Sequence, residues 1–563
     1  MSELKPQTTK LTMRSVFSNE APSFQEKNDE NGLAQLGYKQ EFTRNYGFLS
    51  TYSFALSISG LMGTISITYL YPLWAGGPAA AIWCWFAGAL GCLTIAWSVA
   101  EITSCFPTSG GMYYVITHVV PKRHVPVVCW IDAWLYFTGA ITGAASTDFG
   151  AATLLMNIIE MRSDYTFKAS RGQTTAVAIL IIITHGIINS FPGHVLANIT
   201  KYYCIVNIGA TIALIITLLA KCPEFNSASF TFTKVINSTG WKDDGWAFLF
   251  GFLQVSWVMT CYDATSRMSE EVHNAAYLTP LAIGSALTTT AILGWILVIV
   301  ITLTMGSDIE GILAAGDQPI VAIFHIAMGK TGATAFLSLS VVILWFCGAV
   351  ATCYISRSLW SFSRDRGLPY YKFWYHLTPK TQAPTRCVWL IVFINSCLTL
   401  INLGSTVAMN AVFSACAVAT DWSYIIVIAA FALNREKMGV SRGPLHLGRF
   451  SKPIMLYSCT WTIFLSIVFI FPNYMPVTKE NMNYTVVILG AVFILAGGWY
   501  VIDARKWYKG PVSNIDEEYD YGTNIEVRNS SEFNNNVNEN DTSTTTTSSE
   551  KKHTAKVHVA EVA

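Results

Sequence analysis

The residues with the clearest capacity for chemistry lie in an apolar run between Phe54 and Ser66, which contains Gly60, Gly63 and several hydroxyl side chains. Glycine weakens a helix, and backbone groups freed by a break in hydrocarbon are tolerated only where they line a cavity. The ends of two half-helices can offer amides to an anionic group and carbonyls to a cation. Glycines can equally serve close packing between helices. A binding site and a packing contact are both open interpretations of this run.

Ionisable side chains within apolar segments are the next candidates, because burying them in a membrane is costly. Asp148 can meet a substrate ammonium or carry a proton, and the alternative is a carboxylate satisfied by neighbouring hydroxyls near the outer end of its helix. Asp263 lies four residues before Arg267, the spacing of a helical ion pair, so we expect a structural pair there. His185 and Asp421 stand alone in their segments, and we expect each to be a satisfied polar residue.

Enzymatic and metal chemistry find little support in the rest of the chain. The 13 cysteines lie mostly singly in apolar segments, where a thiol behaves as a small hydrophobic group, and no pair has the spacing of a zinc site. No phosphate-binding Gly-Lys-Ser or Gly-Lys-Thr loop occurs, and no cluster of His, Asp and Glu marks one membrane face. We expect a protein that is not an enzyme and that uses no metal or cofactor.

The composition identifies the elements that must hold these residues. Charged residues make up only 13% of the chain and hydrophobic residues 52%, against about 25% charged residues in soluble proteins. No charged residue occurs between Arg44 and Glu101, a stretch long enough for two membrane crossings of about 20 residues each. No basic cluster with interleaved aromatic residues indicates nucleic-acid binding. The sequence therefore predicts an all-α polytopic membrane protein embedded in a lipid bilayer.

Charge-free apolar runs define the expected transmembrane helices. The ninth and tenth share one uncharged stretch, so that eleven helices are an alternative to twelve. An excess of Lys and Arg in alternate loops places both termini in the cytoplasm. The twelve predicted spans are 48–72, 79–100, 127–156, 174–192, 199–220, 246–265, 281–304, 332–358, 388–404, 408–431, 454–471 and 484–502.

Polar composition separates the two ends of the chain from the transmembrane domain, 46–510. Residues 1–45 and 511–563 contain too little apolar surface to fold alone. We expect both to be disordered cytoplasmic tails.

The predicted topology also bears on glycosylation. The loop 221–245 is expected outside the cytoplasm, which makes Asn237 in Asn-Ser-Thr a candidate glycosylation site. A second such sequence, at Asn198, is expected to face the cytoplasm.

Three polar segments follow membrane helices and combine Gly or Pro with charged residues. They are Glu…Phe-Pro-Thr-Ser-Gly-Gly-Met-Tyr (101–113), Ser-Glu-Glu-Val-His-Asn…Pro (269–280) and Ser-Arg-Asp-Arg-Gly-Leu-Pro (363–369). Together with the small-residue run, their order and spacing resemble the amino acid–polyamine–organocation permeases. Three further stretches resemble the fungal branch of GABA and choline permeases, namely 76–78, 443–448 and 476–484.

The resemblance implies two inverted repeats of five helices, followed by two additional helices, with helices 1 and 6 broken beside the substrate. It also implies an open segment over 60–66. Asp148 resembles an acid found at that place in the GABA-type permeases. Two departures matter: the family's Gly-Ser-Gly break reads Gly-Thr-Ile at 63–65, and helix 6 lacks a central glycine. The substrate-binding residues that it implies are Ser59, Gly60, Gly63, Thr64 and Ser66 from helix 1, and Ser256, Trp257 and Cys261 from helix 6.

A transporter accounts for these features together. We expect a secondary active transporter, driven by protons, for an amino acid or amino-acid-like solute such as GABA, because half-helix ends suit a carboxylate and acidic or aromatic groups suit an ammonium. An organic cation such as choline, a polyamine or thiamine is the alternative substrate, and a non-transporting nutrient sensor is the alternative class. We expect the plasma membrane rather than a vacuolar or other internal membrane.

Overall fold

The computed structural model describes residues 22–316, 318–404, 406–478 and 482–514. The regular elements among them are helices, and the one pairing of extended segments is an isolated parallel bridge between Tyr46 and Val272. Eleven of the described helical segments are long and apolar enough to cross a membrane. The predicted all-α polytopic membrane architecture is confirmed.

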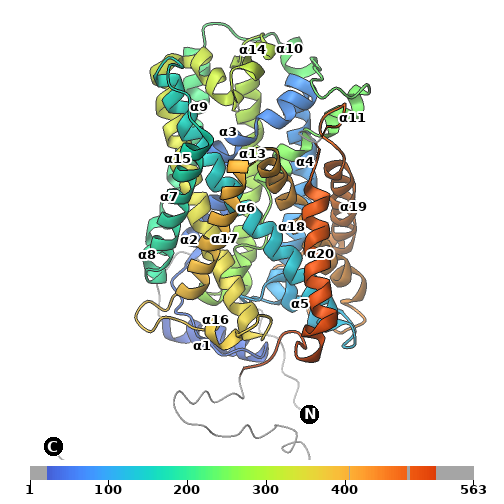
Figure 1. The fold of residues 1–563 in the computed structure, drawn as a ribbon. Coiled ribbons are helices and arrows are strands. Elements are labelled where there is room, and N and C mark those ends of the chain that lie inside the picture. The colour runs from blue at the N-terminus through green and yellow to red at the C-terminus, as the bar shows by residue number, and fades with distance from the viewer. Residues whose placement is uncertain (1–21, 317, 405, 479–481, 515–563) are drawn as a thin grey trace, which may run out of the picture. The chain divides into compact units, whose positions relative to one another are not determined.

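Figure 1 shows these helices, coloured along the chain. Most run the length of the bundle, and short helices connect them at its two ends. In chain order they are α1 (Pro22–Gln35), α2 (Phe48–Ser59), α3 (Leu61–Thr68), α4 (Leu70–Cys105), α5 (Met112–Val119), α6 (Val125–Arg162), α7 (Arg171–Asn189), α8 (Gly193–Lys201), α9 (Tyr203–Lys221), α10 (Ala228–Thr233), α11 (Asp244–Leu249), α12 (Phe252–Val258), η2 (Ser266–Glu271), α13 (Ala275–Thr304), α14 (Ile309–Ala314), α15 (Pro319–Arg364), α16 (Tyr371–Trp374), α17 (Thr385–Gly404), α18 (Thr406–Asn434), η3 (Gly448–Phe450), α19 (Ser451–Ile470), α20 (Thr485–Ile502) and η4 (Ala504–Lys506).

Two predicted spans are interrupted in the structure. The span 48–72 is divided between α2 and α3 at Gly60, whose left-handed backbone (φ 56°) ends the first helix. The prediction of one helix over 246–265 is wrong, because the segment is divided between α11 and α12 and the chain after Val258 as far as Thr265 is not helical. Each of the other predicted spans coincides with a long helix, and the ninth and tenth are separate helices, α17 and α18.

The interrupted helices are packed among long ones. The most extensive helix pairs are α13 with α4, α18 with α6 and α15 with α6, and α3 contacts α15, α12 and α13. Small residues permit this close approach: a methyl group built at Gly294 of α13 would overlap the ring of Trp85 of α4. The interrupted segments are the first and sixth in the chain, the order that a repeat of five helices requires.

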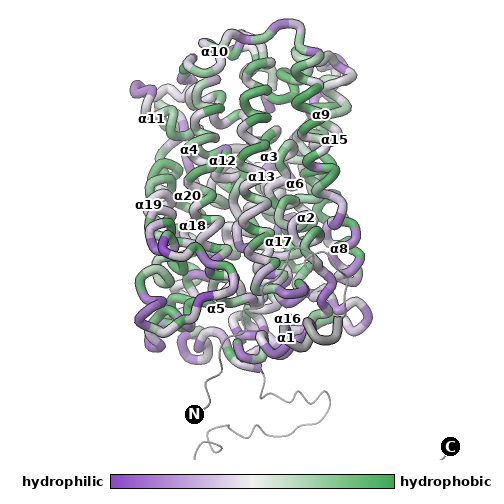
Figure 2. The backbone as a smooth tube through the Cα atoms, turned by 180° about the vertical axis from the view of Figure 1, so that it is seen from behind, coloured by the Kyte–Doolittle hydropathy of each residue, from purple (hydrophilic) through white to green (hydrophobic). Residues whose placement is uncertain are grey.

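Hydropathy follows the length of the bundle. Figure 2 shows hydrophobic residues along the middle of the helices and hydrophilic residues at both ends. Several large apolar side chains on the sides of the helices are exposed, among them Leu180, Ile205 and Ile494. These side chains lie where a bilayer would cover them, as expected for helices that face lipid.

Buried ion pairs connect the polar segments to one another and to α15 and the end of α18 at the end of the bundle that carries α1, α5 and α16. Each arginine is matched by a carboxylate from another segment, and the N–O distances are 3.2 Å for Arg364–Glu270, 2.9 Å for Arg357–Glu271 and 3.0 Å for Arg435–Glu101. The acidic members come from 101–113 and 269–280, and Arg364 comes from 363–369. These segments therefore close the end of the bundle that is predicted to be cytoplasmic.

The predicted tails are described only in part. Of 1–45, the structure describes 22–45, which contains α1 and buries Tyr38. Of 511–563, it describes 511–514, and the remainder of both tails lies outside the described residues.

Asp365, at the end of α15, joins these two chain ends. Its Oδ1 accepts hydrogen bonds from the Tyr38 hydroxyl (3.0 Å) and from the Val512 amide (3.2 Å). Burial raises the pKa of Asp365 to about 8. Burial thus favours the uncharged form of this carboxyl group, whereas the two hydrogen bonds that it accepts favour the charged form.

Candidate functional site

The break in helix 1 is a single left-handed turn. Gly60 (φ 56°, ψ 4°) ends α2 by donating its amide to the Leu56 carbonyl (3.2 Å), and its own carbonyl accepts the amide of Gly63 (2.9 Å). Among the described residues, no acceptor is present for the amides of Leu61 and Met62, the first two of α3. Free amides at the start of a helix carry partial positive charge and can bind an anionic group.

The open segment predicted over 60–66 is therefore too long, because the chain is helical again directly after the break. The Thr64 hydroxyl donates to the Ser59 carbonyl across the break. The Ser66 hydroxyl donates to the Met62 carbonyl (2.7 Å), one turn earlier. Both hydroxyls satisfy backbone groups of their own segment, which holds α3 closed.

Gly63 lies against a neighbouring helix. A methyl group at Gly63 would be 2.9 Å from the Ser340 carbonyl oxygen and 3.0 Å from side-chain carbons of Ile343 and Leu344, all on α15. Of the two interpretations left open for this glycine, the contacts favour close packing.

The break in helix 6 is longer and contains no glycine. α12 ends at Val258, and the non-helical link continues to Thr265 before η2 begins. Cys261 has a left-handed backbone (φ 59°), and the Tyr354 hydroxyl donates to its sulfur (3.2 Å). Within the described part of the chain, the carbonyls of Trp257 and Val258 at the end of α12 accept no hydrogen bond. This break thus presents free carbonyls.

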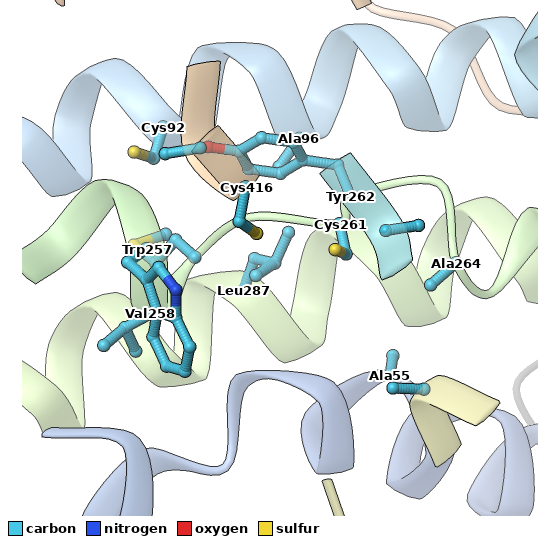
Figure 3. Close-up of a cluster of buried hydrophobic side chains, with 14 of the residues drawn as sticks. Ala55, Cys92, Ala96, Trp257, Val258, Cys261, Tyr262, Ala264, Leu287 and Cys416 are labelled. Atoms are coloured by element: carbon cyan, nitrogen blue, oxygen red, sulfur yellow. The ribbon is translucent and has the colours of Figure 1, made fainter. Parts of the chain in front are cut away.

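The two breaks meet at one small cavity, part of whose wall is seen in Figure 3. Its free volume is about 10 Å³, room for about one water molecule. Of the predicted site residues, Ser59 and Cys261 line it. The complete lining is Ala55, Ile58, Ser59, Thr260, Cys261, Tyr262, Thr265, Ile283 and Leu287.

Ser256 and Trp257 lie on α12 beside this cavity and do not line it. Both side chains are buried, and within the described residues the Ser256 hydroxyl and the Trp257 indole nitrogen have no hydrogen-bond partner. The Trp257 ring stacks on Phe413 of α18, with ring centres 5.9 Å apart. Buried polar groups are normally satisfied, so these two donors are available to a ligand or to water.

Asp148 has a partner that the sequence did not reveal. His185 Nδ1 on α7 lies 3.3 Å from Asp148 Oδ1 on α6, and both side chains are at most 1% exposed. The expectation of an isolated, satisfied His185 is wrong, and no described hydroxyl satisfies the Asp148 carboxylate. The two groups are close enough for an ion pair and are not aligned as a hydrogen bond. The sequence signal that could have predicted this contact was one ionisable residue in each of two consecutive apolar helices.

The Asp148–His185 pair lies behind the break in helix 1. A methyl group at Gly348 of α15 would overlap Asp148 Oδ1 and lie 2.5 Å from the His185 ring. The neighbouring Cys347 thiol donates to the Ile58 carbonyl (3.0 Å), just before the break. Asp148 does not line the cavity. One turn of α15 therefore separates the pair from the candidate site.

The predicted structural pair in helix 6 is confirmed. Arg267 Nη2 lies 2.7 Å from Asp263 Oδ2, and both side chains are almost completely buried. Tyr424 donates its hydroxyl to Asp263 Oδ1 (2.7 Å), and the guanidinium of Arg267 stands over the Tyr136 ring, 4.0 Å from its centre. Asp263 is occupied by these partners.

The side chain of Asn237 is engaged within its own loop. Its Nδ2, the atom to which a glycan is attached, donates to the Trp241 carbonyl (2.8 Å) and to Asp244 Oδ1 (2.9 Å). A glycan would replace one of these bonds, so glycosylation at Asn237 stays a prediction.

Comparison with known proteins gives one consistent result. A family model described as "Amino acid permease" matches residues 46–493. An uncharacterized amino-acid permease of Schizosaccharomyces pombe is 42% identical, covering 89% of this chain and 93% of the relative. Amino-acid permease 2 of Neurospora crassa is 32% identical, covering 91% and 94%. The BAT1 amino-acid permease of Arabidopsis thaliana is 30% identical, covering 86% and 96%.

Proposed function

We propose, from the premise that the chain belongs to the amino acid permease family, proton-coupled transport of a small zwitterion such as GABA. Family membership makes the protein a multi-pass membrane transporter of amino acids and not an enzyme. The observation that supports the proposal is that the two helix breaks meet at one cavity, which Ser59 lines from the first break and Cys261 from the second, beside the start of α3 and the end of α12.

The carboxylate of the solute would bind at the start of α3. The amides of Leu61 and Met62 are free there, and the helix dipole adds partial positive charge. The ammonium group would bind at the end of α12, where the carbonyls of Trp257 and Val258 are free and the dipole is negative. A zwitterion satisfies both ends, whereas a simple cation or anion satisfies one.

Binding requires the two breaks to move apart, because a cavity of about 10 Å³ cannot hold an amino acid. The residues that must separate are those that line both sides, chiefly Ser59 and the link at Cys261. Trp257 and Ser256 would then gain access to the solute with donors that are free in the closed structure.

Proton coupling would use the Asp148–His185 pair. The two side chains can share a single proton, and their contact with α15 places them one turn from the break in helix 1. Cys347 is the other titratable group facing this region from α15. Gain or loss of the proton would change the packing of Gly348 and so the position of helix 1.

An organic cation such as choline is the second candidate substrate. Tyr262 lines the cavity and Trp257 lies beside it, and aromatic faces bind quaternary ammonium groups through cation–π interactions. No carboxylate lines the cavity in the described structure.

Uptake of a labelled panel tests the proposed substrate. GABA, neutral amino acids, choline, polyamines and thiamine are supplied to cells that lack the corresponding transporters and express this chain. We expect uptake of GABA or a neutral amino acid. Uptake of choline, a polyamine or thiamine alone would establish the second candidate, and surface-exposed protein without any uptake would favour a sensor.

A cavity-filling variant tests the site. Cys261→Phe should abolish uptake per molecule of surface protein, because the added ring occupies the space between the breaks. Cys397→Phe is the matched control, since Cys397 is exposed on α17. Normal transport per molecule by Cys261→Phe would remove the cavity from the mechanism.

The plasma membrane is the proposed location. Fluorescence of the tagged full chain, compared with markers of the plasma and vacuolar membranes, tests it. Signal on internal membranes alone would overturn the proposal without affecting the proposed site.

A further inference from the structure

A second cavity lies between the end of α18 and the start of α19, apart from the candidate substrate site. Its volume is about 310 Å³, and it is at the end of the bundle predicted to be cytoplasmic. Four cationic side chains line it together with one acidic side chain, Glu436. The cations are Arg435, Arg442, Arg449 and Lys452.

The cations of this cavity differ in their partners. Arg435 is held by the buried Glu101, with Nη1 and Oε1 3.0 Å apart. The side chains of Arg442, Arg449 and Lys452 form no ion pair or hydrogen bond within the part of the chain that the structure describes. Like charges around one hollow repel each other, and Glu436 can offset only one of them. The cavity is thus suited to an anion with more than one negative charge.

An excess of basic residues at a cytoplasmic face is common, and by itself it reports only topology. Other arginines at this end are occupied: Arg357 is paired with Glu271, and Arg386 donates to the Phe373 carbonyl (2.8 Å). The cations at 442, 449 and 452 line a hollow without an ion pair or hydrogen bond in the described structure, and Arg449 contacts the ring of Phe450, 4.9 Å from its centre. The start of α19, a helix of 20 residues, adds partial positive charge at the same place.

The surroundings of the cavity indicate which anion it holds. Three large apolar side chains near it are more than half exposed: Leu433 at the end of α18 (54%), Phe450 in η3 (56%) and Tyr457 in α19 (51%). The acyl chains of a lipid whose headgroup occupies the cavity would lie against them, whereas a free phosphate would make no contact with them. Basic pockets between membrane helices on the cytoplasmic side bind anionic headgroups.

We infer that this cavity binds the phosphate-bearing headgroup of an anionic phospholipid of the cytoplasmic leaflet. Arg442, Arg449 and Lys452 contact the headgroup, and the acyl chains lie along α18 and α19 beside Leu433 and Tyr457. Because Arg435 also holds Glu101 of segment 101–113, the lipid is connected to the layer of ion pairs that closes this end of the bundle.

Lipid retention measured on the purified full chain tests the inference. The chain is titrated in detergent with phosphatidylinositol phosphate or phosphatidylcholine, and bound lipid is counted by native mass spectrometry. We expect phosphatidylinositol phosphate to bind at least tenfold more tightly. The triple variant Arg442→Gln, Arg449→Gln, Lys452→Gln should lose roughly tenfold or more in affinity for it.

The matched control removes three exposed cations from the same end of the protein but outside the cavity, through Lys122→Gln, Arg123→Gln and Lys380→Gln. It should bind within about twofold of the wild type, whereas diffuse surface charge would weaken both variants equally. Equal loss in the control, or none in the cavity variant, would overturn the inference. Soluble inositol phosphate that binds as tightly as the lipid would establish a free phosphate as the ligand instead.

A folding check accompanies these measurements. Thermal unfolding in phosphatidylcholine alone should be the same for the wild type and both triple variants. If the cavity variant does not fold, the single variant Arg442→Gln, at an exposed loop position, replaces it and should still weaken binding severalfold. Unchanged binding by this folded variant would count against the site.

Discussion

The two helix breaks meet at the same cavity, but different buried acids stand behind them. Helix 1 breaks at a glycine, and behind it Asp148 faces His185, with Gly348 of α15 packed against both side chains. Helix 6 breaks at a non-glycine residue, Cys261, and Asp263 within the break is bound by Arg267.

The difference lies in which partner can change its charge. Arginine stays protonated throughout the physiological pH range, so the pair of Asp263 is a permanent one. Histidine can be neutral or charged, unlike arginine, so the pair of Asp148 is not a permanent one. The comparison indicates a fixed support in helix 6 and a changeable one behind helix 1.

The largest effect is expected from Asp263→Asn. Arg267 would stay buried without its ion-pair partner, and breaking a buried pair costs about 3 to 5 kcal/mol. Surface abundance and thermal unfolding of the extracted protein should both fall sharply. Asp503→Asn, in an exposed pair with Lys506, is the control and should be close to the wild type. Normal abundance of Asp263→Asn would contradict a structural role for this pair.

Gly63→Leu should have the next largest effect. Its side chain would enter backbone and side chains of α15, and overpacking costs about 1 to 3 kcal/mol. We expect less protein at the surface, with normal uptake per surviving molecule. Gly490→Leu on α20, where no described atom lies within 4 Å of an added methyl group, should be tolerated. Abundant Gly63→Leu protein that fails to transport would instead place Gly63 in the substrate site.

Asp148→Asn should spare folding and remove coupling. A proton gradient of one pH unit supports about tenfold accumulation of a solute carried with one proton. In vesicles with such an inward gradient, we expect the variant to equilibrate GABA without accumulating it, while exchange persists. His185→Gln should behave similarly, and His194→Gln, exposed on α8, should accumulate normally. Full accumulation by Asp148→Asn would exclude the pair from coupling.

The smallest effect is expected from Cys261→Gly. Glycine adopts φ 59° without strain, which gains roughly 1 kcal/mol, and the lost hydrogen bond from Tyr354 costs a similar amount. Thermal unfolding should therefore change by only a few degrees. Cys261→Val, whose branched side chain disfavours this backbone, should be less stable than both the wild type and Cys261→Gly. A large loss in Cys261→Gly would show that the cysteine side chain itself holds the break.

The helix 1 run illustrates how far sequence reasoning reached. The glycine and hydroxyl content between 54 and 66 left a break and close packing both open, and the family resemblance implied the break that the structure has at Gly60. Neither predicted the length of the break, which depends on the turn at Gly60 and on hydroxyl bonds of Thr64 and Ser66. Helix 6 gave a weaker signal, since a left-handed cysteine is not visible in a sequence.

The ion pairs likewise include one contact that the sequence predicted and one that it did not. The spacing of Asp263 and Arg267 is local, one turn of backbone, and was sufficient to predict their contact. The contact of Asp148 with His185 joins two helices, and it depends on how α6, α7 and α15 approach one another at Gly348. Helix rotation and crossing follow from packing of the whole bundle, which no local pattern encodes.

By itself, then, the sequence determined that this chain is a polytopic membrane protein and which polar segments recur in its family, because hydrophobicity and motif order are properties of the chain. Only the tertiary structure decided that Glu101, Glu270 and Glu271 of two polar segments pair with Arg435, Arg364 and Arg357, and which predicted site residues line the cavity. The physical reason is that burial and pairing are relations between distant segments, and they exist only once the helices have packed.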